Sequence, residues 1–195
     1  MGDPPKKHCL LLILDGWGIA DPAEHNAVWV ANTPFLDGLK TEYPNTQLAC
    51  AGKAVGLPEG IMGNSEVGHL NIGAGRVVYQ ALLRIDVAIK DGSFFDNPVL
   101  KNAMEAVGRR GTALHLMGLV SDGGVHSQMT HLYALIDMAA RFGLQNLYIH
   151  AILDGRDTPP DSGVTYITRL QQAIEEKGVG QIATICGRYY AMDRD

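Results

Sequence analysis

The chain has 195 residues, of which 46% are hydrophobic, a net charge of −5 and a pI near 5.8. This length fits one domain or two small ones, and the hydrophobic content suits a globular protein. The acidic balance gives no support to a general role on nucleic acid or membrane surfaces, whereas the three widely spaced cysteines, without a metal-binding spacing, favour a reduced cytosolic interior.

The first element follows a short polar tail, residues 1–7. Residues 8–14 form an apolar run that predicts a strand covered on both faces. The run is too short to cross a membrane, and no signal-peptide cleavage pattern accompanies it. Asp15 follows the run directly, where a carboxylate can bind a metal. A turn aspartate without a ligand is an equally good interpretation.

The next segments lead to a candidate nucleophile. Thr33 and Pro34 predict a helix that reaches residue 43, and residues 46–51 predict a strand. After a turn-rich run, Ser65 stands at the start of a predicted helix. Gly63 would let the backbone approach a bulky anion, and free N–H groups of the first turn can bind phosphate oxygens. From this segment alone, an ordinary helix cap at Asn64 or Ser65 is the better interpretation.

The second half of the chain has a regular pattern. Residues 73–76 predict a loop that marks a hinge or boundary, and residues 81–90 and 98–109 predict helices. Strands are predicted at 112–120, 147–153 and 181–186, and helices at 128–142 and from 161 or 162 to 177. This alternation predicts βαβ units, and therefore an α/β fold with mainly parallel sheets and flanking helices.

Three polar loops follow the three predicted strands, at residues 121–127, 154–160 and 187–195. Parallel strands direct their carboxyl ends to one edge of the sheet, where ligands bind. Arginines bind phosphate and carboxylate through paired hydrogen bonds, and His and Asp can move protons. In any single loop, a cap, a local ion pair or a solvated arginine is the simpler interpretation. The three loops together favour a binding site formed by His126, Arg156, Asp157, Arg188 and Arg194.

Five runs closely resemble the cofactor-independent (2,3-bisphosphoglycerate-independent) phosphoglycerate mutases, and together they extend over nearly the whole chain. The runs are LDGWG at 14–18, MGNSEVGH at 62–69, VSDGGVHS at 120–127, LDGRDTPP at 153–160 and GRYYAMDRD at 187–195. The resemblance implies an isomerase of the alkaline-phosphatase-like superfamily that interconverts 3-phosphoglycerate and 2-phosphoglycerate in glycolysis and gluconeogenesis. It also implies two divalent metal ions, typically Mn²⁺, and a cytoplasmic location.

The resemblance also implies roles for individual residues. Ser65 matches the nucleophile, which becomes phosphoserine and ligates one metal, and Asp15 matches a ligand of that metal. Asp157 matches a proposed acid/base. The substrate-binding positions correspond to His126, Arg156, Asp157, Arg188 and Arg194.

Residues 1–79 would form part of the metal domain, and residues 80–195 part of an inserted substrate domain. The implied partner is a small phosphoglycerate, with no nucleic acid and no membrane, and the full-length proteins are expected to be monomers.

Two departures from the family pattern affect these expectations. Gln128 stands where the family often has His, which would alter polar contacts in the site. The chain is also much shorter than family members, whose remaining metal ligands lie in the part it does not span. We therefore expect residues 8–14 to have exposed apolar faces and unpaired edges. Two alternatives stay open: a truncated, non-catalytic α/β fragment that binds phosphorylated acids, and a related metal phosphatase or phosphopentomutase.

Overall fold

The structure, a computed structural model, describes residues 8–194. The predicted polar tail (residues 1–7) and Asp195, the last residue of the third polar loop, lie outside the described residues. The helices, with η marking 3-10 turns, are α1 (Ala27–Val30), α2 (Pro34–Glu42), η1 (Gly52–Val55), α3 (Ser65–Ala74), α4 (Ala81–Asp91), η2 (Ser93–Asp96), α5 (Pro98–Arg110), α6 (Met129–Arg141), α7 (Gly163–Lys177) and α8 (Arg188–Ala191). The strands are β1 (Leu114–Leu119), β2 (Leu147–Leu153) and β3 (Gln181–Gly187).

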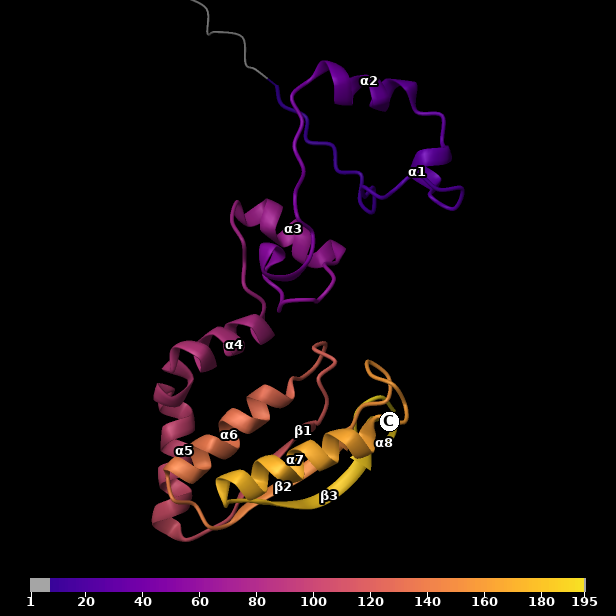
Figure 1. The fold of residues 1–195 in the computed structure, drawn as a ribbon. Helices are drawn as coiled ribbons and strands as arrows, with labels where there is room; N and C mark the ends of the chain where they lie inside the picture. Colours follow the sequence, from indigo (N-terminus) through magenta and orange to yellow (C-terminus); the bar gives the residue numbers. More distant parts are fainter. Residues whose placement is uncertain (1–7, 195) are drawn as a thin grey trace, which may run out of the picture.

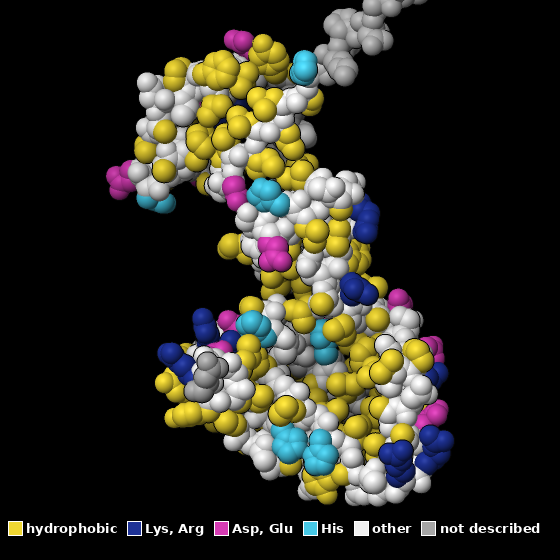
Figure 2. Space-filling view, turned by 180° about the vertical axis from the view of Figure 1, so that it is seen from behind, with side chains coloured by type: hydrophobic (Ala, Val, Ile, Leu, Met, Phe, Trp, Pro, Cys, Tyr) yellow, Lys and Arg dark blue, Asp and Glu magenta, His cyan; other side chains and the backbone are white. Residues whose placement is uncertain are grey.

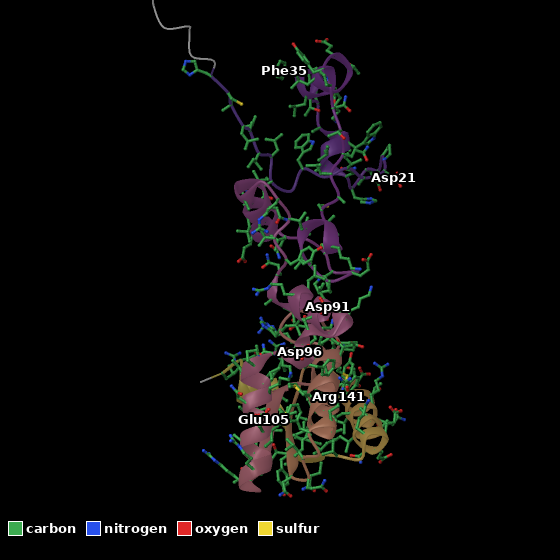
Figure 3. The ribbon with its side chains drawn as sticks, turned by 90° about the vertical axis from the view of Figure 1, so that its left-hand side faces the viewer. Asp21, Phe35, Asp91, Asp96, Glu105 and Arg141 are labelled. Atoms are coloured by element: carbon green, nitrogen blue, oxygen red, sulfur yellow. The ribbon has the colours of Figure 1, made fainter. Side chains whose placement is uncertain are left out.

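The elements follow one another along an elongated molecule (Figure 1). Helices α1 and α2 lie at one end, α3 lies in the middle, and α4 leads into the body that contains the sheet. Phe35 and Asp21 are accordingly far from Arg141, which lies in the sheet-containing body (Figure 3). No helix in residues 8–194 combines the length and apolar content that a bilayer crossing needs.

The sheet has three parallel strands in the order β1-β2-β3, which confirms the predicted βαβ pattern. Leu114 pairs with Leu147 across the first two strands, and Tyr148 pairs with Gln181 across the next two. The connecting helices end where the glycines predicted, because Gly143 and Gly178 take the positive φ that ends a helix. All three polar loops therefore begin at the same edge of the sheet.

One face of the sheet packs against α6 and α7 (Figure 1). Side chains from both helices and from β2 form one buried cluster, to which α5 adds Met104. The opposite face has no helix over it in the described chain, and apolar and histidine side chains gather there (Figure 2). On that face His115 stacks on Tyr148 and its ring nitrogen lies 2.9 Å from that of His150.

The predicted strands at 8–14 and 46–51 are wrong for this structure. Residues 8–14 have no regular secondary structure, and Leu10 is 86% exposed. A strand needs a neighbour to pair its N–H and C=O groups, and within residues 8–194 none lies beside this run. Ala51 forms only an isolated bridge with Met62. The expected exposed apolar faces are confirmed, whereas the strand itself does not form.

The middle of the molecule is a small unit built by η1 and α3, with Val55 and Val67 buried. Asn71 ties it together, since its amide donates to the Val55 carbonyl and its oxygen accepts from the Val78 N–H. Helix α3 continues to Ala74, so the predicted loop at 73–76 begins only at Gly75. The small apolar side chains at the end of α3 continue the helix until Gly75 takes a left-handed φ.

Candidate functional site

Ser65 is the first residue of α3, and its hydroxyl is not used as the helix cap. Asn64 is the N-cap, because its side-chain oxygen accepts the Val67 N–H at 3.1 Å. The Ser65 hydroxyl instead donates to Asp15 Oδ2 at 2.6 Å, across 50 residues of sequence. The structure thus brings together the two residues that the family resemblance assigns to the same metal ion.

His69, one turn further along α3, also contacts the Ser65 hydroxyl. Its Nδ1 lies 3.2 Å from Ser65 Oγ and 2.8 Å from the Ser65 carbonyl oxygen. The sequence analysis gave His69 no role here. The i, i+4 spacing, which puts two side chains on the same face of a helix, was the available signal. The Ser65 hydroxyl therefore lies between a carboxylate and an imidazole on an exposed surface.

Gly63 allows a close approach of two backbone segments that the sequence did not indicate. A Cβ at this position would lie 1.9 Å from the Cys50 carbonyl oxygen, so two segments of backbone meet where only glycine fits. The glycine allows the turn before α3 to close on residue 50. The approach of a bulky anion to Gly63 stays a prediction.

The residues described do not form a two-metal centre on their own. Carboxylate and hydroxyl oxygens suit a hard divalent cation, and Asp15 and Ser65 supply two such groups. In residues 8–194, however, no three or more His, Cys, Asp or Glu side chains are grouped to hold a metal ion. A stable site needs more ligands than these two residues provide.

The three polar loops meet at the carboxyl edge of the sheet, as predicted, and Arg188 is their centre. Its guanidinium donates through Nε and Nη2 to Asp193, and through Nη1 to Asp154 at 2.9 Å and Asp157 at 2.7 Å. The Arg188 side chain is only 4% exposed. Hydrogen bonds to Asp193 and Asp157 raise the pKa of Arg188 above its usual value, against the opposing effect of burial.

Asp154, which directly follows β2, belongs to the same network, and its side chain is buried. Burial alone would raise the pKa of Asp154, but hydrogen bonds from the Ser121 hydroxyl, the Asp157 and Arg156 backbone N–H groups and Arg188 lower it to about 2. Hydrogen bonds from Arg188 likewise lower the pKa of Asp193. The carboxylates of Asp154 and Asp193 are therefore negatively charged at neutral pH, and they balance the positive charge of Arg188.

The other predicted binding residues surround this network with fewer contacts. Arg156 is 70% exposed, with Nη1 3.7 Å from Asp193, and His126 Nε2 lies 3.8 Å from Asp157 Oδ2. The Arg194 guanidinium lies over the Tyr189 ring, 5.3 Å from its centre. A cavity of about 670 Å³ is lined by all three arginines, whereas His126 lines a separate cavity over β1.

Three residues of the network had no role in the sequence analysis: Ser121, Asp154 and Asp193. Each lies in a run that resembles the family, and Asp154 directly follows β2, which was the usable signal. Gln128, where the family often has His, precedes α6, and its amide nitrogen lies 3.0 Å from where a Cβ on Gly124 would be. The Ile61 side chain lies equally close to that position, so the segment before Ser65 approaches the first polar loop.

Comparison with known proteins identifies the family of the chain. A family profile described as "BPG-independent PGAM N-terminus" matches residues 85–195. The 2,3-bisphosphoglycerate-independent phosphoglycerate mutase of Clostridium beijerinckii is 58% identical over 190 residues, which are 97% of this chain and 37% of that protein. The enzyme of the same name from Moorella thermoacetica is 59% identical over 186 residues, 95% of this chain and 36% of that protein.

A solved structure is similar as well. The phosphoglycerate mutase of Leishmania mexicana, crystallised at low cobalt concentration, matches with a TM-score of 0.67 and 37% identity, over 90% of this chain and 33% of that one. The chain thus spans little more than a third of the length of these relatives. Since the profile matches more than half of the residues, the chain belongs to the family of BPG-independent phosphoglycerate mutases and corresponds to their N-terminal region.

Proposed function

We propose that this chain is part of an isomerase that interconverts 3-phosphoglycerate and 2-phosphoglycerate through a phosphoserine at Ser65. The observation that carries the proposal is the 2.6 Å hydrogen bond from Ser65 to Asp15, which aligns the two residues although they are 50 positions apart. The names of the relatives support the same reaction.

In the proposed reaction the phosphoryl group moves twice. The exposed Ser65 hydroxyl loses its proton to water and its oxygen bonds to phosphorus, while the phosphorus–oxygen bond to glycerate breaks. The released glycerate oxygen gains a proton, which Asp157 is suited to supply. The other hydroxyl of glycerate then gives its proton back to Asp157 and its oxygen bonds to phosphorus, while the phosphorus–oxygen bond to Ser65 breaks and the serine oxygen regains a proton from water. Both half-reactions need the glycerate to stay bound while its orientation changes.

The three arginines at the edge of the sheet are proposed to hold the glycerate. Arg156, Arg188 and Arg194 line one cavity, and guanidinium groups match the geometry of carboxylate and phosphate oxygens. His126 lies 3.8 Å from Asp157 and completes the polar edge of the site. A small phosphorylated acid is therefore the proposed ligand of the region.

The wider setting of the reaction is also a proposal. Residues 1–79 would belong to a metal domain and residues 80–195 to a substrate domain, in a monomeric cytoplasmic enzyme of glycolysis and gluconeogenesis. Two divalent ions, with Mn²⁺ as the first candidate, are included because of the family resemblance. Asp15 and Ser65 would contribute two ligands, and the others would come from outside the described residues.

The test is the transfer of label to Ser65. In the full-length protein that contains this chain, rapid quenching after addition of 3-phosphoglycerate labelled in its phosphate should place the label on Ser65, as read by peptide mass spectrometry. Ser65→Ala should abolish both label and turnover, because it removes the acceptor oxygen. Ser93→Ala, at a serine just after α4, is the matched control and should behave as the parent. Label on a histidine would overturn the phosphoserine proposal.

The same preparation separates the alternatives. A metal phosphatase would release inorganic phosphate without forming 2-phosphoglycerate, and a phosphopentomutase would act on pentose phosphates instead. A non-catalytic fragment would bind 3-phosphoglycerate and convert none of it. Formation of 2-phosphoglycerate that depends on Ser65 would support the mutase alone.

A further inference from the structure

One buried carboxylate connects the ends of all three strands. We propose that Asp154 is the positioning residue of the substrate region: it shapes the turn that carries Arg156 and Asp157 and fixes Arg188 against that turn. This inference rests on the proposed function for its ligand, although not for its structural part. The Asp154 side chain is only 3% exposed, and the residue forms part of the wall of the cavity that the three arginines line.

The two carboxylate oxygens of Asp154 accept hydrogen bonds from different loops. Oδ1 accepts the backbone N–H groups of Arg156 at 3.1 Å and Asp157 at 2.9 Å, which is the arrangement by which an aspartate stabilises the turn that follows it. Oδ2 accepts the Ser121 hydroxyl at 2.7 Å, from the loop after β1. The turn after β2 is therefore held from inside the protein.

Arg188 directly follows β3 and brings the third loop into contact with Asp154. Its Nη1 donates both to Asp154 and to Asp157, so Asp157 is oriented twice: its backbone by Asp154 and its side chain by a cation that Asp154 also holds. Four of the five guanidinium N–H groups are used by carboxylates, which leaves one for a ligand. In this arrangement Arg188 orients the acidic groups more than it contacts a substrate.

Two substitutions separate hydrogen bonding from charge. In Asp154→Asn the amide oxygen can still accept both backbone N–H groups and Arg188. The new N–H₂ can donate to the Ser121 hydroxyl, which can also act as an acceptor. This variant keeps the geometry and removes the charge. Asp154→Ala removes every one of these hydrogen bonds and leaves the Ser121 hydroxyl and the Arg188 guanidinium without this partner.

The matched control is Asp137→Ala. Asp137 lies near the end of α6, away from the carboxyl edge of the sheet, and accepts from Lys177 and Arg141 at 2.6 Å each. It is also a carboxylate paired with cations, and burial is incomplete at 20% exposure. Its loss should lower the stability of the chain without affecting the site.

The experiment measures two quantities on each variant of the 195-residue chain. Amide hydrogen exchange at Arg156 and Asp157, relative to sheet amides such as that of Ile149, reports the turn without any ligand. Isothermal titration with 3-phosphoglycerate reports the dissociation constant. We expect exchange in Asp154→Ala to be at least about tenfold faster than in the parent, whereas in Asp154→Asn and Asp137→Ala it stays within about threefold.

The dissociation constant should follow the same order, with a rise of about tenfold or more in Asp154→Ala only. Exchange in Asp154→Ala that equals the parent would overturn the positioning role, and so would Asp154→Asn exchanging as fast as Asp154→Ala. Should Asp154→Ala lose protection throughout the sheet, Ser121→Ala decides. It removes the hydrogen bond to Oδ2 and, besides that, only the long 3.5 Å contact from the Gly123 N–H, and parent-like exchange in it would count against the proposal.

Failure of the proposed function would look different. A parent chain with the expected exchange pattern that does not bind 3-phosphoglycerate would leave the role of Asp154 in the turn intact. It would remove the phosphoglycerate assignment of the three arginines.

Discussion

Asp15 is the residue whose assignment the structure makes most testable, because its only described side-chain hydrogen bond is with the Ser65 hydroxyl. Asp15→Asn keeps the size of the side chain and removes its negative charge. In the full-length protein we expect this change to weaken Mn²⁺ binding far more than 3-phosphoglycerate binding, since an amide is a poorer ligand for a hard cation.

Metal content by mass spectrometry and substrate affinity by calorimetry provide the two readings. A variant with the metal content of the parent, whose lost activity no excess of Mn²⁺ restores, would show that Asp15 is not a metal ligand.

The lowered pKa of Asp154 predicts a dependence of stability on pH. The value of about 2, against an ordinary 3.8, means that the folded chain holds this carboxyl charged more strongly than the unfolded chain does. Its contribution is therefore complete above the unfolded pKa and disappears as the pH falls through the folded pKa. Over that window it is on the order of 2 kcal/mol.

The free energy of unfolding of the parent should fall by that much more than that of Asp154→Asn between about pH 5 and pH 2. Urea unfolding followed by circular dichroism at each pH gives the difference, in which the other acidic groups, including Asp193, cancel. Parallel curves for the two proteins would contradict the assigned pKa.

At the scale of elements, we expect alanine substitution to have opposite effects on the stability of α3 at two glycines, Gly63 before the helix and Gly73 within it. In Gly63→Ala the new Cβ would lie 1.9 Å from the Cys50 carbonyl oxygen, so the backbone at one of the two residues must move. We expect a loss of about 1–3 kcal/mol in the local stability of α3, typical of an overpacked position. Hydrogen exchange of the Val67 amide measures it.

Gly73→Ala is the control, because Gly73 lies inside α3 and a Cβ there would meet no atom of another segment within 4 Å. There the substitution should stabilise the helix by up to about 1 kcal/mol, since alanine is the better helix former. Equal effects at Gly63 and Gly73 would mean that the contact with Cys50 does not constrain the turn.

The success of the sequence-based predictions depends on how local each signal is. Residues 147–153 form the predicted strand because their neighbours in β1 and β3 lie within the same segment of chain. Residues 8–14 have an equally strong apolar pattern, but a strand also needs a partner, and a pattern in one segment cannot supply it. The pairing of Ser65 with Asp15 agreed with the family resemblance, which already contained the long-range information.

The hydrogen bonds between Asp154 and Arg188 could not be predicted from local sequence patterns. The sequence patterns placed both residues at the edge of the sheet. They predicted that Arg188 binds the ligand, which stays a prediction, and they indicated neither its contacts with three carboxylates nor any role for Asp154. Which carboxylates an arginine contacts depends on how three loops fold over one another, and the burial that leaves Arg188 4% exposed is a property of the packed loops together. Long-range polar networks are thus the part of the site that requires a structure.

Over the whole molecule, side-chain packing is uneven. The two parts of the candidate site therefore differ in how much buried structure supports them. The substrate region rests on the buried cluster formed by the sheet and helices α5, α6 and α7. The Ser65–Asp15 contact lies instead on exposed chain, beside a small buried group in which Val55 and Val67 are the large apolar side chains. The region that would bind the ligand is therefore better supported than the region that would perform the transfer.

This asymmetry leads to the prediction for the chain itself: the 195-residue protein should show no measurable mutase turnover, even with Mn²⁺. Two oxygen ligands from Asp15 and Ser65 cannot hold or orient a pair of cations, and residues 8–194 contain no group of three or more suitable ligands. Without a bound cation the serine hydroxyl stays near its ordinary, weakly nucleophilic form. Weak binding of 3-phosphoglycerate by the arginines at the sheet edge should nevertheless survive.

An enolase-coupled assay at high protein concentration measures the turnover, with the full-length protein as positive control and its Ser65→Ala variant as the background. Calorimetry on the same sample measures the surviving binding. Turnover within about tenfold of the full-length control would correspond to a barrier only ~1.4 kcal/mol higher. Such a rate would require that residues 1–195 supply the catalytic centre by themselves, and the proposed dependence on ligands from outside this chain would then be wrong.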